Sequence, residues 1–394
     1  MTFRRLRAVL AVLGLVAALV CGMGGSAPTA GTASACTAPY CTNPGPPGPI
    51  DIAAGTLDLH DGVMQKFGNT YYLYGTEYGC GYTWQQNPTP WCGFGVSTSS
   101  SAYGPWSTPQ LLFSPNAADP YEPGHSYQYV CGQSSSGCFS PRMVQRSGWG
   151  ANDGVFVLWF NAPAYMDAAF GSAPHGYMIM GCNGPAGPCG ASAGAPYGST
   201  HRPTLHQCAG ANGDAGLTAS VENNSIYLVC PKAEASLSIE QLSVWGSDGT
   251  GTGANNLAGL THIEATGTYR DPATGTWILT YSDPNCGYCA GTGTGYATAP
   301  DVLGPWTAPA NVGVGAPVSG RRDLAATSCG GQPDTVSVMD GQAWQKIDLW
   351  TGAMNETGAG LHFEPLDYDP TIYGTGTTGD GGPWRPPFNQ WTCQ

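Results

Sequence analysis

The stretch Gly68-Asn69-Thr70-Tyr71-Tyr72-Leu73-Tyr74 joins a tight-turn signal to a short strand of aromatic and aliphatic residues. Turns built from Asn, Asp and Gly beside such residues are the strongest short-range signal of a β-hairpin. The same design recurs, leading into strands at Val155–Trp159, Ile226–Val229, Thr276–Tyr281 and, as the weakest copy, Gln342–Trp350. Each copy predicts the second arm of a hairpin, and regular recurrence predicts a radial repeat. We therefore expect an all-β fold, a five-bladed β-propeller of antiparallel four-stranded blades.

A propeller gathers the first strand of every blade around one central funnel, where residues far apart in sequence converge. We expect the starts of these strands to face that axis, at Asp61, near Pro141, near Thr218, at Glu264 and near Gln332. A ligand site formed from several blades would lie there.

The N-terminal segment has the pattern of a secretory signal peptide over residues 1–35. Arg4, Arg5 and Arg7 precede the short apolar run Leu10–Val20, and Ala33-Ser34-Ala35 is a small-residue cleavage site. Lipid attachment at Cys21 is an open alternative, disfavoured by the bulky residues before it. Residues 36–56 form a Pro/Gly-rich leader that we expect to run outside the sheets. The propeller domain would then span 57–394.

The composition favours an exported protein that acts on a neutral substrate. The formal net charge is −13, and charged residues make up only 10% of the chain. This balance argues against nucleic acid or an anionic membrane as a partner. We expect a secreted, extracellular monomer.

The cysteines predict a disulfide framework. The sequence has 15 cysteines, and an even number remains once Cys21 leaves with the signal. The expected pairs are Cys36–Cys41, Cys80–Cys92, Cys131–Cys138, Cys182–Cys189, Cys208–Cys230, Cys286–Cys289 and, by elimination, Cys329–Cys393. A redox role for Cys286-Gly287-Tyr288-Cys289, or a zinc site at the cysteines, stays open as a less favoured interpretation.

Several motifs resemble glycoside hydrolase family 43, and within it the exo-acting galactan 1,3-β-galactosidase branch. The segment from Leu59-His60-Asp61-Gly62 to Tyr74-Gly75 is similar to the first blade of that family. His262-Ile263-Glu264-Ala265-Thr266, followed by Trp277–Ser282, resembles the blade that carries the general acid. Gly295–Ala299 with Gly304-Pro305-Trp306 resembles the next strand and turn, and Ser328-Cys329-Gly330-Gly331-Gln332 resembles a Ser-Gln motif of the galactanase branch.

The resemblance implies a five-bladed propeller and inverting glycoside hydrolysis, which needs a general acid and a group that activates water. Glu264 would be the acid, since it opens a strand between apolar neighbours; otherwise it is an exposed strand-end residue. Asp61 would be near the general base, or else part of an Asp-Gly turn. Asp214 would be the third carboxylate that tunes the acid, or a loop residue. Gln332 matches a glutamine that replaces a base in the branch, or is an ordinary polar residue after a Gly-Gly turn. We expect Asp61 or Gln332 to lie across the funnel from Glu264 at a separation that leaves room for water.

Other residues are candidates for substrate binding. His60 would contact a sugar hydroxyl, or instead satisfy a hydrogen bond in the core. Tyr82, Trp84 and Trp91 lie on the loop closed by Cys80 and Cys92, where we expect exposed aromatic faces to stack on sugar rings. The branch has a Glu where this sequence has Phe139, so Arg142 becomes the polar candidate of blade two.

The leading hypothesis is therefore a secreted hydrolase of neutral polysaccharides with galactosyl, arabinosyl or xylosyl units. A propeller that binds carbohydrate without cleaving it is the alternative, and a structural or protein-binding propeller is a third. We expect no required cofactor and no metal among the site residues. A structural calcium ion in the funnel is an open possibility.

Overall fold

Five antiparallel sheets form the fold, and each contains one turn-then-strand repeat as its second strand. The computed structural model describes residues 47–133, 137–146, 155–170, 172–190, 201–220, 224–232, 236–285, 291–308, 323–372, 387–389 and 391–393. The signal segment, most of the leader, and the pairs Cys36–Cys41 and Cys286–Cys289 lie outside these residues.

The blades follow one another along the chain. Blade one consists of β2 (Met64–Phe67), β3 (Thr70–Thr76), β4 (Phe94–Ser99) and β5 (Gln110–Leu111). Blade two consists of β6 (Phe139–Gln145), β7 (Phe156–Asn161) and β8 (Tyr177–Cys182). Blade three consists of β9 (Gly216–Ser220), β10 (Ser225–Pro231), β11 (Leu237–Leu242) and β12 (Gly249–Ala254). Blade four consists of β13 (Glu264–Arg270), β14 (Trp277–Asp283), β15 (Gly293–Ala299) and β16 (Asp323–Ala325).

Blade five takes strands from both ends of the described chain. It consists of β17 (Gln332–Met339), β18 (Gln342–Leu349), β19 (Gly360–Tyr368) and β1 (Ile50–Ile52), with β20 (Phe388–Asn389) paired to β19. Short helices lie in the connections: α1 (Tyr127–Gln133), η1 (Pro163–Met166), η2 (Ala168–Phe170), η4 (Ser328–Gly330) and η5 (Pro370–Ile372). None of the described helices has the length and apolar character needed to span a bilayer.

The core consists of five clusters of buried apolar side chains, one between each pair of neighbouring blades. Adjacent residues of a second strand point into different clusters: Ile278 packs toward blade five, whereas Leu279 packs toward blade three. This alternation follows from the two-residue period of a strand. It also explains why these strands are apolar at nearly every position, since both faces are buried.

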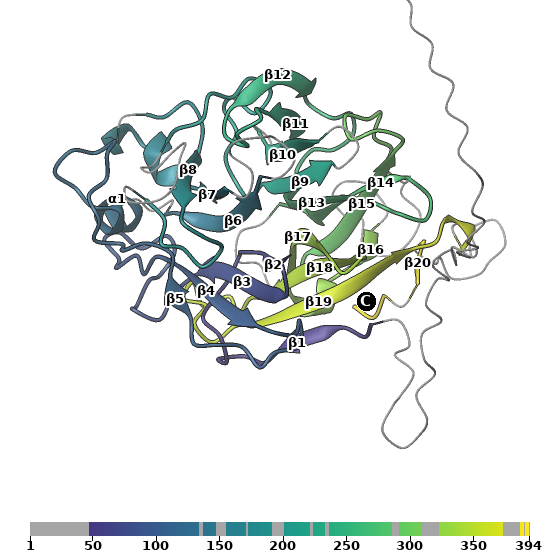
Figure 1. The fold of residues 1–394 in the computed structure, drawn as a ribbon, viewed down its shortest axis with the longest axis horizontal. Helices are drawn as coiled ribbons and strands as arrows, with labels where there is room; N and C mark the ends of the chain where they lie inside the picture. Colours follow the sequence, from purple (N-terminus) through teal and green to yellow (C-terminus); the bar gives the residue numbers. More distant parts are fainter. Residues whose placement is uncertain are drawn as a thin grey trace, which may run out of the picture. The chain divides into compact units, whose positions relative to one another are not determined.

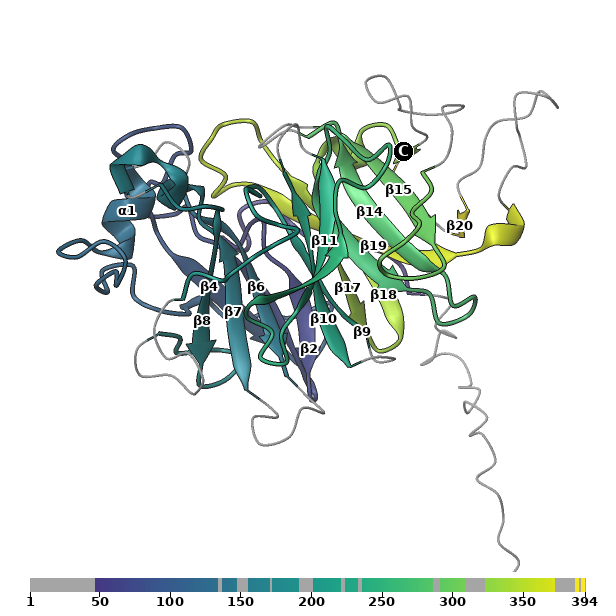
Figure 2. The same ribbon diagram turned by 90° about the horizontal axis from the view of Figure 1, so that it is seen from above.

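The inner strands gather at the centre of the ring. β9 lies beside β13, β13 beside β17, and β17 beside β2. Their labels meet in the middle of Figure 1, and Figure 2 shows the same strands from above. The predicted five-bladed propeller is confirmed, except that blade two has three strands among the described residues.

The expectation that the Pro/Gly-rich leader stays outside the sheets is wrong for Ile50–Ile52. These residues form β1 and pair with β19, with Ile50 opposite Phe363 and Ile52 opposite Leu361. The prolines end at Pro49, and the sequence Ile-Asp-Ile that follows buries both isoleucines while Asp51 stays exposed. An alternating pattern of this kind is enough for an edge strand.

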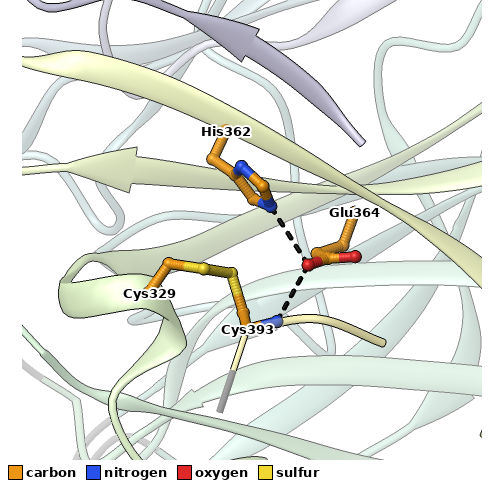
Figure 3. Close-up of side chains that lie close together, drawn as sticks. All are labelled: Cys329, His362, Glu364 and Cys393. Carbon is orange, nitrogen blue, oxygen red and sulfur yellow. Dashed lines mark hydrogen bonds and ion pairs between the residues drawn. A yellow bond between two sulfur atoms is a disulfide. The ribbon is translucent and has the colours of Figure 1, made fainter. Parts of the chain in front are cut away.

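A cluster on β19 fixes the C-terminal tail (Figure 3). Cys393 forms a disulfide with Cys329, and its backbone N–H donates to Oε1 of Glu364 at 2.9 Å. His362 bridges Glu364, at 3.1 Å from Nε2 to Oε1, and Asp51 of β1, at 2.7 Å from Nδ1 to Oδ1. Cysteine, histidine and glutamate are all zinc ligands. Here the two sulfurs are bonded to each other, so the cluster acts as a latch between β1, β19 and the tail.

The disulfide framework is confirmed wherever its cysteines are described. Cys80–Cys92, Cys131–Cys138, Cys182–Cys189, Cys208–Cys230 and Cys329–Cys393 are all bonded. The described cysteines are thus covalently paired, which removes them as thiolate ligands for zinc.

The tail disulfide should contribute more stability than a local one. Cys329 and Cys393 are separated by 64 residues, whereas Cys182 and Cys189 are separated by 7. Restriction of the unfolded chain predicts a loss of roughly 4 kcal/mol for the double serine variant of the first pair and roughly 2 kcal/mol for the second. Urea unfolding of both variants would measure this, and equal losses would contradict it.

The latch should also make stability depend on pH. Burial lowers the pKa of His362, but its hydrogen bonds to Glu364 and Asp51 outweigh that effect and raise the pKa above 6.5. The protonated histidine therefore stabilises the fold below the unfolded-state pKa, and this stabilisation is lost as the pH rises through the folded-state pKa. The difference in unfolding free energy between wild type and His362→Gln should shrink from about pH 5 to about pH 8. A constant difference would show that His362 acts only by packing.

Candidate functional site

Three of the inner strands begin with a β-bulge, and the bulges carry the polar residues of the funnel. The pairing register shifts between Phe139 and Arg142 in β6, between Glu264 and Gly267 in β13, and between Pro333 and Val336 in β17. A bulge re-aims side chains at the end of a strand and is frequent beside active sites. Ser140 and Ala265 within two of these bulges have left-handed φ angles of 55° and 52°.

The predicted general acid contacts the predicted glutamine. Nε2 of Gln332 donates to Oε1 of Glu264 at 3.0 Å, and Oε1 of Gln332 accepts from Nε1 of Trp350 at 3.0 Å. An indole N–H is only a donor, so Trp350 fixes the amide with its NH₂ group toward Glu264. Glu264 begins β13, as expected, and is half-buried.

The contact corrects one expectation about Gln332. We expected Asp61 or Gln332 to face Glu264 at a separation that leaves room for water. A direct hydrogen bond of 3.0 Å leaves no such room, so Gln332 orients Glu264 instead. For Asp61 the separation stays a prediction.

Asp61 lies just ahead of β2 in a buried position on the funnel side of blade one. Its Oδ1 accepts a hydrogen bond from the Thr76 hydroxyl at 2.8 Å. Burial, followed by the charges of Asp214 and Asp348, raises the pKa of Asp61 well above its ordinary value, while Lys346 and the Thr76 hydrogen bond act in the opposite direction.

Asp214 comes from the loop ahead of β9, and its surroundings are polar. Oδ1 accepts a hydrogen bond from the Ser140 hydroxyl of β6. Burial raises the pKa of Asp214, against the lowering effects of Ser140 and Arg142. Burial, followed by the charges of Asp214 and Glu264, raises the pKa of Tyr177 well above its ordinary value. A Cβ on Gly213, next to Asp214, would lie 3.9 Å from Oε2 of Glu264, so the loop that carries Asp214 lies close to Glu264.

A set of buried ion pairs contacts the backbone of Asp61. Nη2 of Arg142 contacts Oδ1 of Asp334 at 2.7 Å, and Nζ of Lys346 lies 3.2 Å from Oδ2 of the same aspartate. Lys346 also forms an ion pair with Oδ2 of Asp348. Burial raises the pKa of Asp334 to about 6, although Arg142 and Lys346 lower it. We call Arg142, Asp334, Lys346 and Asp348 the ionic ring.

The contacts within the ionic ring decide whether its carboxylates could bind a calcium ion. Both oxygens of Asp334 accept hydrogen bonds from cationic side chains, and both oxygens of Asp348 accept from Lys346 or from the Asp61 backbone N–H. Two carboxylates are thus matched by two cations of the chain. These residues do not fit a calcium site, which needs carboxylate oxygens available as ligands.

The predicted substrate contacts are placed unequally. His60 is buried, with Nε2 at 3.4 Å from Oδ1 of Asp58, and neither ring nitrogen has a hydrogen-bond partner among the described residues. Its ring lies 5.9 Å from that of Trp350, which places it beside the Gln332–Glu264 contact. Arg142 does not face outward: its Nη1 donates to the Asp61 carbonyl at 2.6 Å.

The aromatic loop differs from expectation. Trp91 is 1% exposed and donates from Nε1 to the carbonyl of Cys138, so the expectation that it presents an exposed face is wrong. It directly precedes Cys92 and β4, and its ring packs 5.0 Å from Phe94 in the core. Tyr82 is also buried and packs 5.9 Å from Phe139. Trp84 is half-buried.

The sequence reasoning missed Asp334, Lys346, Asp348, Ser140, Tyr177 and Trp350. One signal was present for part of this set. Gln342–Trp350 is the weakest copy of the repeat because charged residues interrupt its apolar pattern, at Lys346 and Asp348. Charges in a strand with two buried faces indicate a polar site rather than a poor strand.

Comparison by sequence finds no matching family model and no matching curated protein. Comparison by structure finds similar propellers. An exo-β-1,3-galactanase variant from Phanerochaete chrysosporium, with β-1,3-galactotriose, has a TM-score of 0.57 and 17% identity, over 81% of this chain and 64% of that chain. A GH43 β-1,3-galactosidase has a TM-score of 0.55 and 15% identity, over 80% and 60%. An endo-1,4-β-xylanase from Bacteroides thetaiotaomicron has a TM-score of 0.52 and 16% identity, over 81% and 94%.

This chain spans less than two thirds of the length of the first two proteins. At such low identity the likeness concerns the fold. The resemblance that the sequence motifs indicated is confirmed at that level: the chain has the five-bladed propeller fold of the GH43 structures.

Proposed function

We propose that this protein is an exported glycoside hydrolase that cleaves O-glycosidic bonds of neutral polysaccharides by an inverting acid/base mechanism. One observation carries the proposal: carboxyl groups from three blades, those of Asp61, Asp214 and Glu264, converge on one funnel. The Asp61 carbonyl accepts from Arg142, and the Asp214 carboxyl accepts from Ser140, both in the bulge of β6. Gly213 places the loop of Asp214 beside Glu264. Inverting hydrolysis requires such a set of carboxyl groups with unequal environments.

Glu264 would protonate the leaving oxygen. The amide of Gln332 donates to Oε1 of Glu264 and so fixes the orientation of the carboxyl group. Gly213 has a φ angle of +113°, which favours glycine, and a Cβ there would lie 3.9 Å from Oε2 of Glu264, so the loop before Asp214 lies beside this carboxyl. Asp214 would be the third carboxylate that tunes this acid.

Asp61 would accept a proton from the attacking water. The two carboxyl groups of an inverting enzyme stand roughly 6.5–9.5 Å apart. Asp61 and Glu264 come from blades one and four, so the funnel can separate them by that distance. The base must be ionised, and Lys346 is the cation that acts to keep it so.

The sugar unit would be galactosyl, arabinosyl or xylosyl. Among the predicted sugar contacts, His60 and Tyr82 are buried, and Nε2 of His60 lies 3.4 Å from Oδ1 of Asp58. The half-buried Trp84 would therefore be the one to stack on a sugar ring. Phe139 packs against Tyr82 where the galactanase branch has a glutamate. Because of this difference, the substrates to be tested include arabinosides and xylosides as well as galactosides.

Export agrees with the covalent framework. Five described disulfides belong to an oxidising compartment, because reducing compartments keep thiols free.

A second candidate is a propeller that binds carbohydrate without cleaving it. The pKa of Asp61 is raised well above its ordinary value, and a base that stays protonated at the working pH would be inactive. A screen with nitrophenyl glycosides and with neutral oligosaccharides, followed by reducing-end detection, separates the two candidates.

The substitution Glu264→Gln should lower the rate on natural oligosaccharides by about 10²–10⁴-fold, because it removes the proton source. Aryl glycosides should lose less, since a nitrophenolate leaves without full protonation. Glu77→Gln is a matched control: burial and the charge of Asp58 raise the pKa of Glu77 to about 7, but it lies outside the funnel set. Wild-type rates for Glu264→Gln on oligosaccharides would exclude it as the acid.

Removal of metal ions should leave the activity within about twofold of its starting value, since Arg142 and Lys346 already pair with the carboxylates of Asp334 and Asp348. The check is hydrolysis before and after extensive chelation, with calcium added back to a parallel sample. Loss on chelation together with recovery on addition of calcium would contradict the charge balance described for the ionic ring.

A further inference from the structure

The backbone of Asp61 is held in an unfavourable conformation. Its φ angle is +52°, in the left-handed region that non-glycine residues rarely adopt. Such a conformation costs on the order of 1 kcal/mol or more and persists only where the surroundings enforce it.

The ionic ring grips both sides of this residue. The Asp61 N–H donates to Oδ1 of Asp348 at 3.2 Å, and the Asp61 carbonyl accepts from Nη1 of Arg142 at 2.6 Å. Arg142 and Asp348 are in turn joined through Asp334 and Lys346. The backbone of Asp61 therefore closes a chain of ion pairs from β6, β17 and β18, bonded at one end through its N–H and at the other through its carbonyl.

Stability alone does not account for the ring. All four of its side chains are buried, with exposures of 4% or less. Removing such charges from water costs so much that apolar residues of similar size would often serve the fold as well or better. In β14, the second strand of blade four, Ser282 lies opposite Glu264 just as Asp348 lies opposite Gln332 in blade five. The places of Lys346 and Asp348 are thus taken there by the uncharged Thr280 and Ser282. The ring must therefore serve the residue that it holds.

We propose that Arg142, Asp334, Lys346 and Asp348 are positioning residues that fix the backbone of Asp61 and keep its carboxyl in the state required of a base. This inference rests on the proposed hydrolase function and gives Arg142 a role other than direct substrate binding.

The inference can be tested because the groups that face Asp61 shift its pKa in opposite directions. From the ring, Lys346 lowers the pKa of Asp61 and Asp348 raises it. From the other elements, Asp214 also raises it, Thr76 contributes a hydrogen bond that lowers it, and Tyr82 lies within electrostatic reach. Arg142 meets Asp61 through the main-chain carbonyl.

Two ring variants should therefore move the acid limb of kcat/KM in opposite directions. Lys346→Met removes the cation, so the pKa of Asp61 rises and the limb moves to higher pH. Asp348→Asn removes an anion but keeps an oxygen for the Asp61 N–H, so the limb moves to lower pH. Lys346→Arg keeps the charge and should leave the limb near its wild-type position. Limbs that stay in place, or move the same way in the first two variants, would overturn the inference.

A third variant separates positioning from substrate binding. Arg142→Met releases the Asp61 carbonyl and should lower kcat on the order of 10²-fold with little change in KM, because misplacement of a catalytic group has that effect. A rise in KM with kcat unchanged would show instead that Arg142 binds substrate.

A titration of carboxyl groups by ¹³C NMR makes the result independent of activity. Asp61→Asn identifies the Asp61 signal, and the signal is then followed in wild type, Lys346→Met and Asp348→Asn. If the wild type cleaves no glycoside, the proposed function fails, while the direction of the NMR shifts still decides the role of the ring. If Lys346→Met does not fold, as judged by circular dichroism, the downward shift in Asp348→Asn must still be present.

Discussion

The burial of both faces of every blade is the constraint on which the rest of the structure depends. Each second strand contributes alternate side chains to two different clusters, so a blade is stable only between two neighbours. The circle of five blades must therefore close. It closes where β1 pairs with β19 and where one cluster packs between blades one and five. Closure of the propeller brings Asp61, just ahead of blade one, next to Asp348 in blade five.

The same constraint sets the chemistry of the funnel. Inner strands that pack closely leave little room for water, so polar groups at their ends are desolvated and must find partners within the chain. The bulges at β6, β13 and β17 turn such groups inward, and each finds a partner from another blade: Ser140 with Asp214, Glu264 with Gln332, Arg142 with Asp334. Pairing between blades is what makes this a site rather than a row of strand ends.

The sequence predicted features that depend on local pattern. The hairpin signals located the second strands, short spacings identified the cysteine pairs, and Glu264 was recognised by its place at a strand start. The ionic ring could not be found in this way, because the partners of Lys346 depend on the register of β17 against β18 and on how blade two meets blade one. Trp91 was misjudged for a related reason: the sequence shows that it lies near a loop but not that the disulfide at Cys92 returns the chain to the core there. The pairing of Ile50–Ile52 was hidden by the prolines before it.

The balance of charge around Asp61 determines whether this funnel can be an enzyme. Burial, Asp214 and Asp348 all raise the pKa of Asp61. A carboxyl subject to those three effects alone would stay protonated and could not act as a base. Lys346 is the principal opposing charge, and it is held in place by Asp334, which is itself held by Arg142. Here the cation is shared between two aspartates beneath a third, which is an arrangement suited to adjusting the ionisation of Asp61. The buried lysine that weakens the strand pattern of blade five is thus the residue on which a catalytic reading of the funnel depends.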